Sequence, residues 1–138
     1  EMERDTKQVD NFYLSADLKQ INGPNSSEFG LEFRADSNYN SYSFSINNDQ
    51  EYSLSVYNND EWTYLIGPDY AKAIIPGESN RLTVIAEGDH IILFINDQYI
   101  ADVHDDTLKK GKASIAIYME NADDQAAFEF DNFELRAP

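Results

Sequence analysis

Apolar and polar residues alternate over most of this chain, and this period of two constrains the fold more than any other feature. In a β-strand successive side chains point to opposite faces, so an alternating segment has one face for a core and one for solvent. Residues 12–18 show the pattern, with Phe12, Leu14, Ala16 and Leu18 on one face. No segment has a convincing helical period. The chain is therefore predicted to be all-β.

Nine further segments alternate in the same way: 28–35, 42–46, 52–56, 61–66, 82–86, 91–95, 99–103, 113–119 and 127–135. Most of the connections are short and rich in Asn, Asp or Gly, which is typical of hairpins. Prolines and glycines bracket residues 67–80, where the alternation stops, and this stretch is predicted to cross between two sheets. About ten short strands predict a two-sheet antiparallel jelly-roll sandwich.

Length and charge narrow the classes of function. With 138 residues the chain is predicted to be one domain, spanning 1–138, and it starts at Glu1 rather than Met, so we expect it to be part of a longer protein. Its formal charge of -16 repels nucleic acid and anionic lipid. No cysteine is present, which excludes thiolate metal sites, and no apolar run suits a membrane helix. We therefore expect no nucleic-acid partner and no direct membrane insertion.

Several stretches resemble small bacterial members of the concanavalin A-like lectin and glucanase superfamily, which are laminin-G-like jelly rolls. The matching stretches are residues 28–34, 42–46, 80–84, 88–96 and 128–133, with the sequences EFGLEFR, YSFSI, NRLTV, GDHIILFIN and FEFDNF. The resemblance covers almost the whole chain and includes the domains of keto-disaccharide hydrolases. It implies a lectin-like module on an extracellular or cell-surface protein. The alternatives are a structural or protein-interaction domain and, with less support, a sugar hydrolase.

Spare aromatic residues suggest where such a module binds carbohydrate. Tyr57, Trp62 and Tyr64 cluster on one predicted hairpin, and Arg34 and Glu32 are expected on the outer face of an adjacent strand. Three further aromatic residues fall outside the inward apolar sets or in loops: Tyr13, Tyr39 and Tyr118. Flat rings cover the apolar face of a sugar while polar groups bind its hydroxyls. The competing interpretation is that Trp62 packs over a hairpin end and that tyrosines simply form strands well.

Two loops supply candidate calcium ligands. Successive turns of a meander alternate between its ends, so Asp36 and Asn38 should lie near Asn58 and Asp60. Calcium prefers such oxygen ligands, although Asp and Asn also favour turns for their own sake. Asp123 and Asp124 form a weaker second candidate site for calcium. The predicted function requires no cofactor, and calcium is the one ion considered.

No catalytic residue is predicted. Glu129, Asp131 and Glu134 resemble a glucanase motif, but they close the chain, and simple alternation puts Glu134 on the opposite face from the other two. They are interpreted as a solvated edge. His90 and His104 have no triad spacing and are interpreted as surface residues.

Overall fold

The computed structural model describes residues 4–119 and 125–138, so the second calcium candidate, Asp123 with Asp124, lies outside it. These residues form eleven strands and no helix. The strands are β1 (Arg4–Val9), β2 (Phe12–Asn22), β3 (Glu28–Ala35), β4 (Ser41–Ile46), β5 (Glu51–Asn58), β6 (Glu61–Tyr70), β7 (Asn80–Glu87), β8 (His90–Ile95), β9 (Gln98–His104), β10 (Gly111–Tyr118) and β11 (Ala127–Arg136). In the described segments, nothing forms a helix that is long and apolar enough to cross a membrane.

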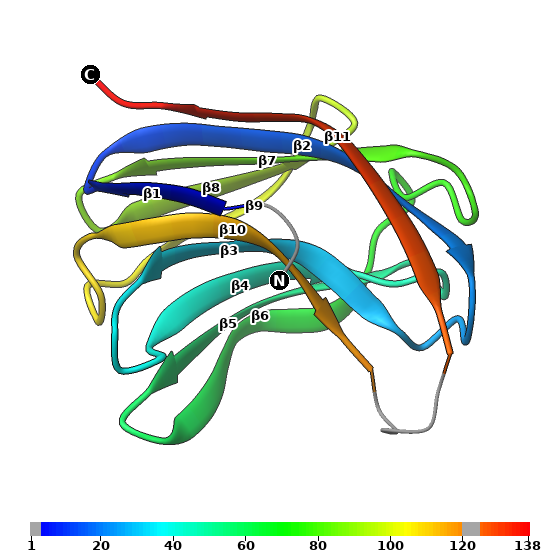
Figure 1. Cartoon of the computed structure of the whole chain (residues 1–138), viewed down its shortest axis with the longest axis horizontal. Coiled ribbons are helices and arrows are strands. Elements are labelled where there is room, and N and C mark those ends of the chain that lie inside the picture. Colours follow the sequence, from blue (N-terminus) through cyan, green and yellow to red (C-terminus); the bar gives the residue numbers. More distant parts are fainter. Residues whose placement is uncertain (1–3, 120–124) are drawn as a thin grey trace.

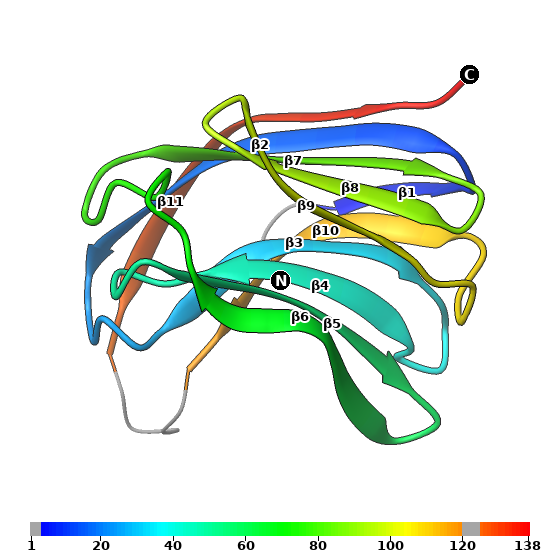
Figure 2. The ribbon, with the colours of Figure 1, turned by 180° about the vertical axis from the view of Figure 1, so that it is seen from behind.

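The strands build two sheets that lie face to face (Figures 1 and 2). The six-stranded sheet has the order β1-β10-β3-β4-β5-β6 and the five-stranded sheet has the order β11-β2-β7-β8-β9. All neighbouring strands pair antiparallel. The predicted all-β sandwich of two antiparallel sheets is confirmed.

The alternating apolar residues face one another between the sheets and form a single core. Among the largest fully buried side chains are Tyr42, Phe29, Phe33, Phe44, Leu14, Leu18, Leu31, Ile46, Leu54, Ile74 and Leu82. The rings of Phe33 and Tyr42 stack, with centroids 5.3 Å apart. The period of two is thus explained by a sheet face packed on a core.

Two boundaries differ from the prediction. Arg4–Val9 form β1, which pairs with β10. This strand was not among the predicted segments, because its sequence does not alternate. The predicted crossover at 67–80 begins later, because β6 continues through Gly67 and Pro68 to Tyr70. Since β6 is an edge strand, a proline that lacks a backbone donor is tolerated there.

Arg34 is a correction to the predicted binding residues. Its side chain is only 1% exposed and does not lie on the outer face of the sheet. The register between β10 and β3 shifts where Lys112 pairs with Ala35 but Ser114 pairs with Glu32, so β3 holds one extra residue. A bulge of this kind breaks the alternation of faces, and Arg34 has a φ of 51° at this point. Arg34 therefore faces inward.

Gly30 is required by a close approach between strands. A Cβ at this position would lie 1.9 Å from the backbone oxygen of Phe44 on β4. We expect Gly30→Ala to force the two strands apart and lower the free energy of unfolding by about 1–3 kcal/mol. Thermal melting of the variant measures this effect, and an unchanged melting temperature would contradict it.

Candidate functional site

A groove crosses the outer face of the six-stranded sheet, and serines form its floor. Ser43 and Ser45 on β4 lie directly opposite Ser55 and Ser53 on β5. The partner of Ser45 on β3 is Gly30, which has no side chain. Small residues leave room above the centre of the sheet, while their apolar neighbours in sequence face the core. All six residues of β4 are buried.

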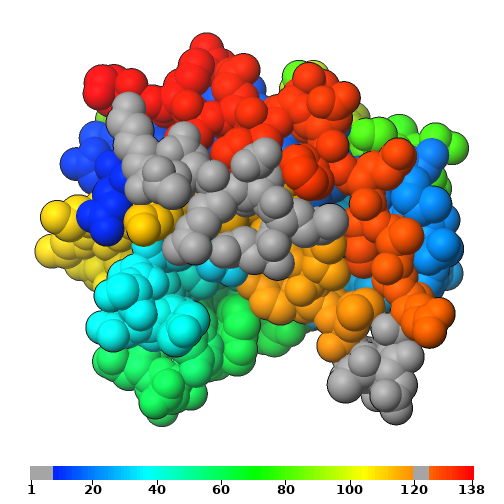
Figure 3. Space-filling view, in the orientation of Figure 1, coloured from blue at the N-terminus to red at the C-terminus, as the bar shows by residue number. Residues whose placement is uncertain are grey.

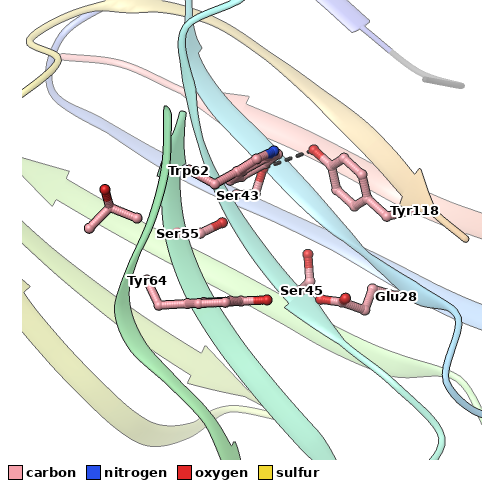
Figure 4. A pocket seen from close by; sticks show the side chains of 8 residues that line it. Glu28, Ser43, Ser45, Ser55, Trp62, Tyr64 and Tyr118 are labelled. Carbon is pink, nitrogen blue, oxygen red and sulfur yellow. Dashed lines mark hydrogen bonds between the residues drawn. The ribbon is translucent and has the colours of Figure 1, made fainter. Parts of the chain in front are cut away.

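Aromatic side chains form the walls of the groove. Trp62 and Tyr64 extend from β6 on one side, and Tyr118 extends from β10 on the other (Figure 4). The centroids of the Trp62 and Tyr118 rings are 6.0 Å apart, with the ring planes at 87°. Four strand spacings separate β6 from β10, which is about 19 Å on a flat sheet. The sheet must therefore curve toward this face, so that the rings meet above the serines.

Trp62 and Tyr118 border two hollows. The first has a volume of about 340 Å³ and is lined by Glu28, Ser43, Ser45, Ser55, Trp62, Thr63, Tyr64 and Tyr118. The second has a volume of about 630 Å³ and is lined by Glu32, Ala35, Asp36, Ser37, Tyr39, Ser41, Tyr57, Trp62 and Tyr118. Both volumes fall within the usual range for small-molecule sites.

Hydrogen bonds hold Tyr118 in place. Its hydroxyl donates to Oε2 of Glu32 at 3.1 Å, so the Ser43 hydroxyl, 2.9 Å away, donates to Tyr118. Burial and the charges of Glu32 and Glu28 raise the pKa of the Tyr118 phenol. The phenol therefore stays protonated at neutral pH and remains a hydrogen-bond donor.

Three carboxylates line the two hollows of the groove: those of Glu28, Glu32 and Asp36. Glu28 and Glu32 lie four residues apart on the same regular stretch of β3, which separates their Cα atoms by about 13 Å. Glu28 and Glu32 thus extend from the same strand, whereas the two carboxylates of a glycosidase flank the scissile bond. None of the described residues that line the two hollows is His, Lys or Arg.

Three of the four predicted carbohydrate-binding residues, Tyr57, Trp62 and Tyr64, line the groove, whereas Arg34 lies in the interior. Sequence reasoning missed the serine floor, and it noted Tyr118 as a spare aromatic residue without placing it beside Trp62. A signal for the floor was present, because serines alternate with core residues on two consecutive strands. Nothing local to residue 118 indicated that its ring meets Trp62.

The loops of the calcium prediction lie side by side, as expected. The backbone N–H of Asn59 donates to Oδ1 of Asn40, and Figure 3 shows the two loops together at one end of the molecule. Oδ1 of Asp36 accepts bonds from the N–H groups of Asn38 and Asn40, at 2.8 and 3.0 Å. Asp60 accepts a bond from the hydroxyl of Tyr57. The loops thus stabilise themselves, and calcium binding by Asp36, Asn38, Asn58 and Asp60 stays a prediction.

The acidic motif on β11 is solvent-exposed, as predicted, but its geometry differs. The register shifts between Asp131 and Glu134, where Asn132 has a φ of 54°. The extra residue turns Glu134 to the same exposed face as Glu129 and Asp131. Both histidines also lie at the surface, on the other sheet from the groove.

Comparison with known proteins places the chain in a family. Residues 4–136 match the sequence profile of the 3-keto-α-glucoside-1,2-lyase-like domain. The chain belongs to this family. The predicted relationship to keto-disaccharide hydrolase domains of the concanavalin A-like superfamily is thereby confirmed. Comparison with curated proteins finds no match by sequence.

Solved structures share the fold of this family member at low sequence identity. The carbohydrate-binding module CBM66 from Bacillus subtilis superposes with a TM-score of 0.81 at 19% identity, over 96% of this chain and 78% of that one. Sheep galectin-11 in complex with glycerol gives 0.63 at 10% identity, over 93% and 94%. A putative glycosyl hydrolase from Parabacteroides distasonis gives 0.61 at 16%, over 96% and 80%.

Proposed function

We propose that this chain is a non-catalytic carbohydrate-binding domain whose ligand lies in the groove of the six-stranded sheet. The observation that carries the proposal is the serine floor between the aromatic walls of Trp62, Tyr64 and Tyr118. Hydroxyl groups both donate and accept hydrogen bonds, as sugar hydroxyls do, and aromatic rings cover the apolar faces of sugar rings. The groove therefore offers both kinds of contact that a sugar needs.

The exposure of the aromatic residues supports a binding role. Trp62 is 53% exposed and Tyr64 is 55% exposed, although both lie beside buried serines. Large apolar side chains around a hollow mark interaction sites on soluble proteins. The acidic lining favours a neutral sugar over a phosphorylated one, because Glu28 and Glu32 repel anions.

The similar structures agree with this proposal. The neighbour with a TM-score of 0.81 is itself described as a carbohydrate-binding module, and the other two are a galectin and a putative glycosyl hydrolase. A domain of this class, with an acidic surface, suits an extracellular or cell-surface protein that meets polysaccharides. We propose this extracellular or cell-surface location together with the function.

A glycan array with the purified protein tests the proposal directly. We expect binding to one class of neutral glycan, and repeating the array with a chelator tests calcium at the rim loops. Binding in calcium alone supports the ions predicted near Asp36 and Asp60, whereas equal binding in both conditions removes calcium from the proposal. No binding to any glycan would favour the structural or protein-interaction alternative instead.

A sugar-cleaving activity is the second candidate, and the name of the family favours it. Glu28, Glu32 and Tyr118 are among the groups in the groove that can exchange protons. Glu28 and Glu32 extend from one strand, β3, which argues against the usual pair of facing carboxylates. Mass spectrometry of each bound glycan, including 3-keto glucosides, after long incubation distinguishes the two candidates. A product that forms with the wild type and not with Tyr118→Phe would establish catalysis.

A further inference from the structure

A cluster of metal-binding side chains lies on the outer face of the five-stranded sheet, on the other sheet from the groove. His90 begins β8, and Asp102 and His104 are near the end of β9. Each of these residues offers one ligand atom, and the three atoms all lie within 4.8 Å of one another. His90 is directly opposite His104 in the hairpin register, and Asp102 is opposite Ile92. All three side chains therefore project from the same face.

The contacts within the cluster are close. Nε2 of His90 lies 2.7 Å from Oδ2 of Asp102. The rings of His90 and His104 stack, with centroids 4.3 Å apart and planes at 11°. Two imidazoles and one carboxylate form a ligand set that zinc and other divalent transition metals prefer, whereas calcium prefers oxygen alone.

Neighbouring side chains orient two of these ligands. Oδ1 of Asp89 lies 3.0 Å from Nδ1 of His104, and the Tyr99 hydroxyl donates to Oδ1 of Asp102. A proton on Nδ1 of His104, donated to Asp89, leaves the lone pair on Nε2, which suits metal binding. Carboxylates that hydrogen-bond the second nitrogen of a histidine are common around protein metal sites.

We propose that His90, Asp102 and His104 bind one divalent transition metal ion, with Zn²⁺ as its representative, and that Asp89 and Tyr99 hold the ligands. The lone pair of an imidazole lies in the ring plane, so one ion cannot lie in both of two parallel planes. One ring must therefore rotate when metal binds. The side chain of His104 is 64% exposed and has room to do so.

The electrostatics of the surface favour a cation at this place. Asp89 and Asp102 contribute two negative charges that offset a divalent ion, and the whole chain carries -16. Three protein ligands leave the fourth position of tetrahedral zinc open to water or to a group from another molecule. This site is independent of the proposed carbohydrate function, because no residue is shared with the two hollows.

The composition of the chain makes the test specific. It contains two histidines and no cysteine, so any imidazole-bound metal must use His90 or His104. Protein without a histidine tag is titrated with Zn²⁺ near neutral pH, and NMR follows the two imidazole rings while calorimetry measures stoichiometry. We expect one ion per chain and a simultaneous shift of both imidazole signals. The same concentration of Ca²⁺ should leave both signals in place.

Three variants and a matched control establish the ligands. We expect His104→Gln and Asp102→Asn to weaken Zn²⁺ binding by about tenfold or more, and Asp89→Asn by about tenfold, as for other residues that support metal ligands. Asp106→Asn removes the same charge from an exposed position near β9 and should bind as the wild type does. Imidazole signals that stay unmoved in excess Zn²⁺, or an Asp102→Asn variant with wild-type affinity, would overturn the proposal.

Discussion

Replacing Trp62 with alanine is expected to weaken carbohydrate binding by about thirtyfold or more while the protein remains folded. Trp62 borders both hollows of the groove. Its ring packs at a tilt against Tyr57 and edge-on against Tyr118. Loss of a central tryptophan in a binding site costs about 2 kcal/mol or more, which corresponds to a fall in affinity of about thirtyfold. Calorimetry with the glycan found on the array measures this loss.

The stability of the same variant separates binding from folding. Trp62 is 53% exposed, so its removal should change the free energy of unfolding by less than about 1 kcal/mol. Tyr99→Ala is the matched control, because Tyr99 is 58% exposed and belongs to the other sheet. We expect this control to bind the glycan normally. Undiminished affinity in Trp62→Ala would move the carbohydrate site out of the groove.

Replacing Arg34 with methionine is expected to cause the largest loss of stability of any single change discussed for this chain. Its guanidinium donates to the backbone carbonyls of Asp10, Gly88 and Leu108, at 2.8, 2.8 and 3.1 Å. These carbonyls belong to three separate connections, between β1 and β2, β7 and β8, and β9 and β10. Arg34 thus joins three turns from both sheets at one end of the sandwich.

The expected size of the loss follows from burial. Hydrogen bonds from a buried charged group contribute more than neutral ones, and removing the donor breaks all three bonds to the turns at once. We expect Arg34→Met to lower the free energy of unfolding by about 3–5 kcal/mol, and the melting temperature by on the order of 10 °C. Arg34→Lys should be intermediate, because a single ammonium cannot reach all three carbonyls in the same directions.

Arg81→Met is the matched control for this measurement. Arg81 forms an ion pair with Asp17 at 2.9 Å, but its side chain is 41% exposed. A pair of this kind contributes less than about 1 kcal/mol. Equal melting temperatures for Arg34→Met and Arg81→Met would show that the buried arginine does not hold the turns together.

The sandwich and one wall of the groove could be predicted from the amino-acid sequence alone. Alternation is a local property, because each residue of a strand faces the opposite side from the last, and it can be recognised without knowing the neighbouring strands. It identified the core positions and left Tyr57, Trp62 and Tyr64 unassigned to the interior. For the same reason, Asp36 and Asp60 could be placed at one end of a meander.

Which distant residues meet depends on how the strands pair in three dimensions. The bulge that turns Arg34 inward depends on the register between β3 and β10, which are far apart in sequence. Tyr118 meets Trp62 because the sheet curves across three intervening strands. His90 reaches Asp102 and His104 through the register of the β8–β9 hairpin. Strand pairing, bulges and sheet curvature arise from contacts between segments, so a period read along one strand cannot contain them.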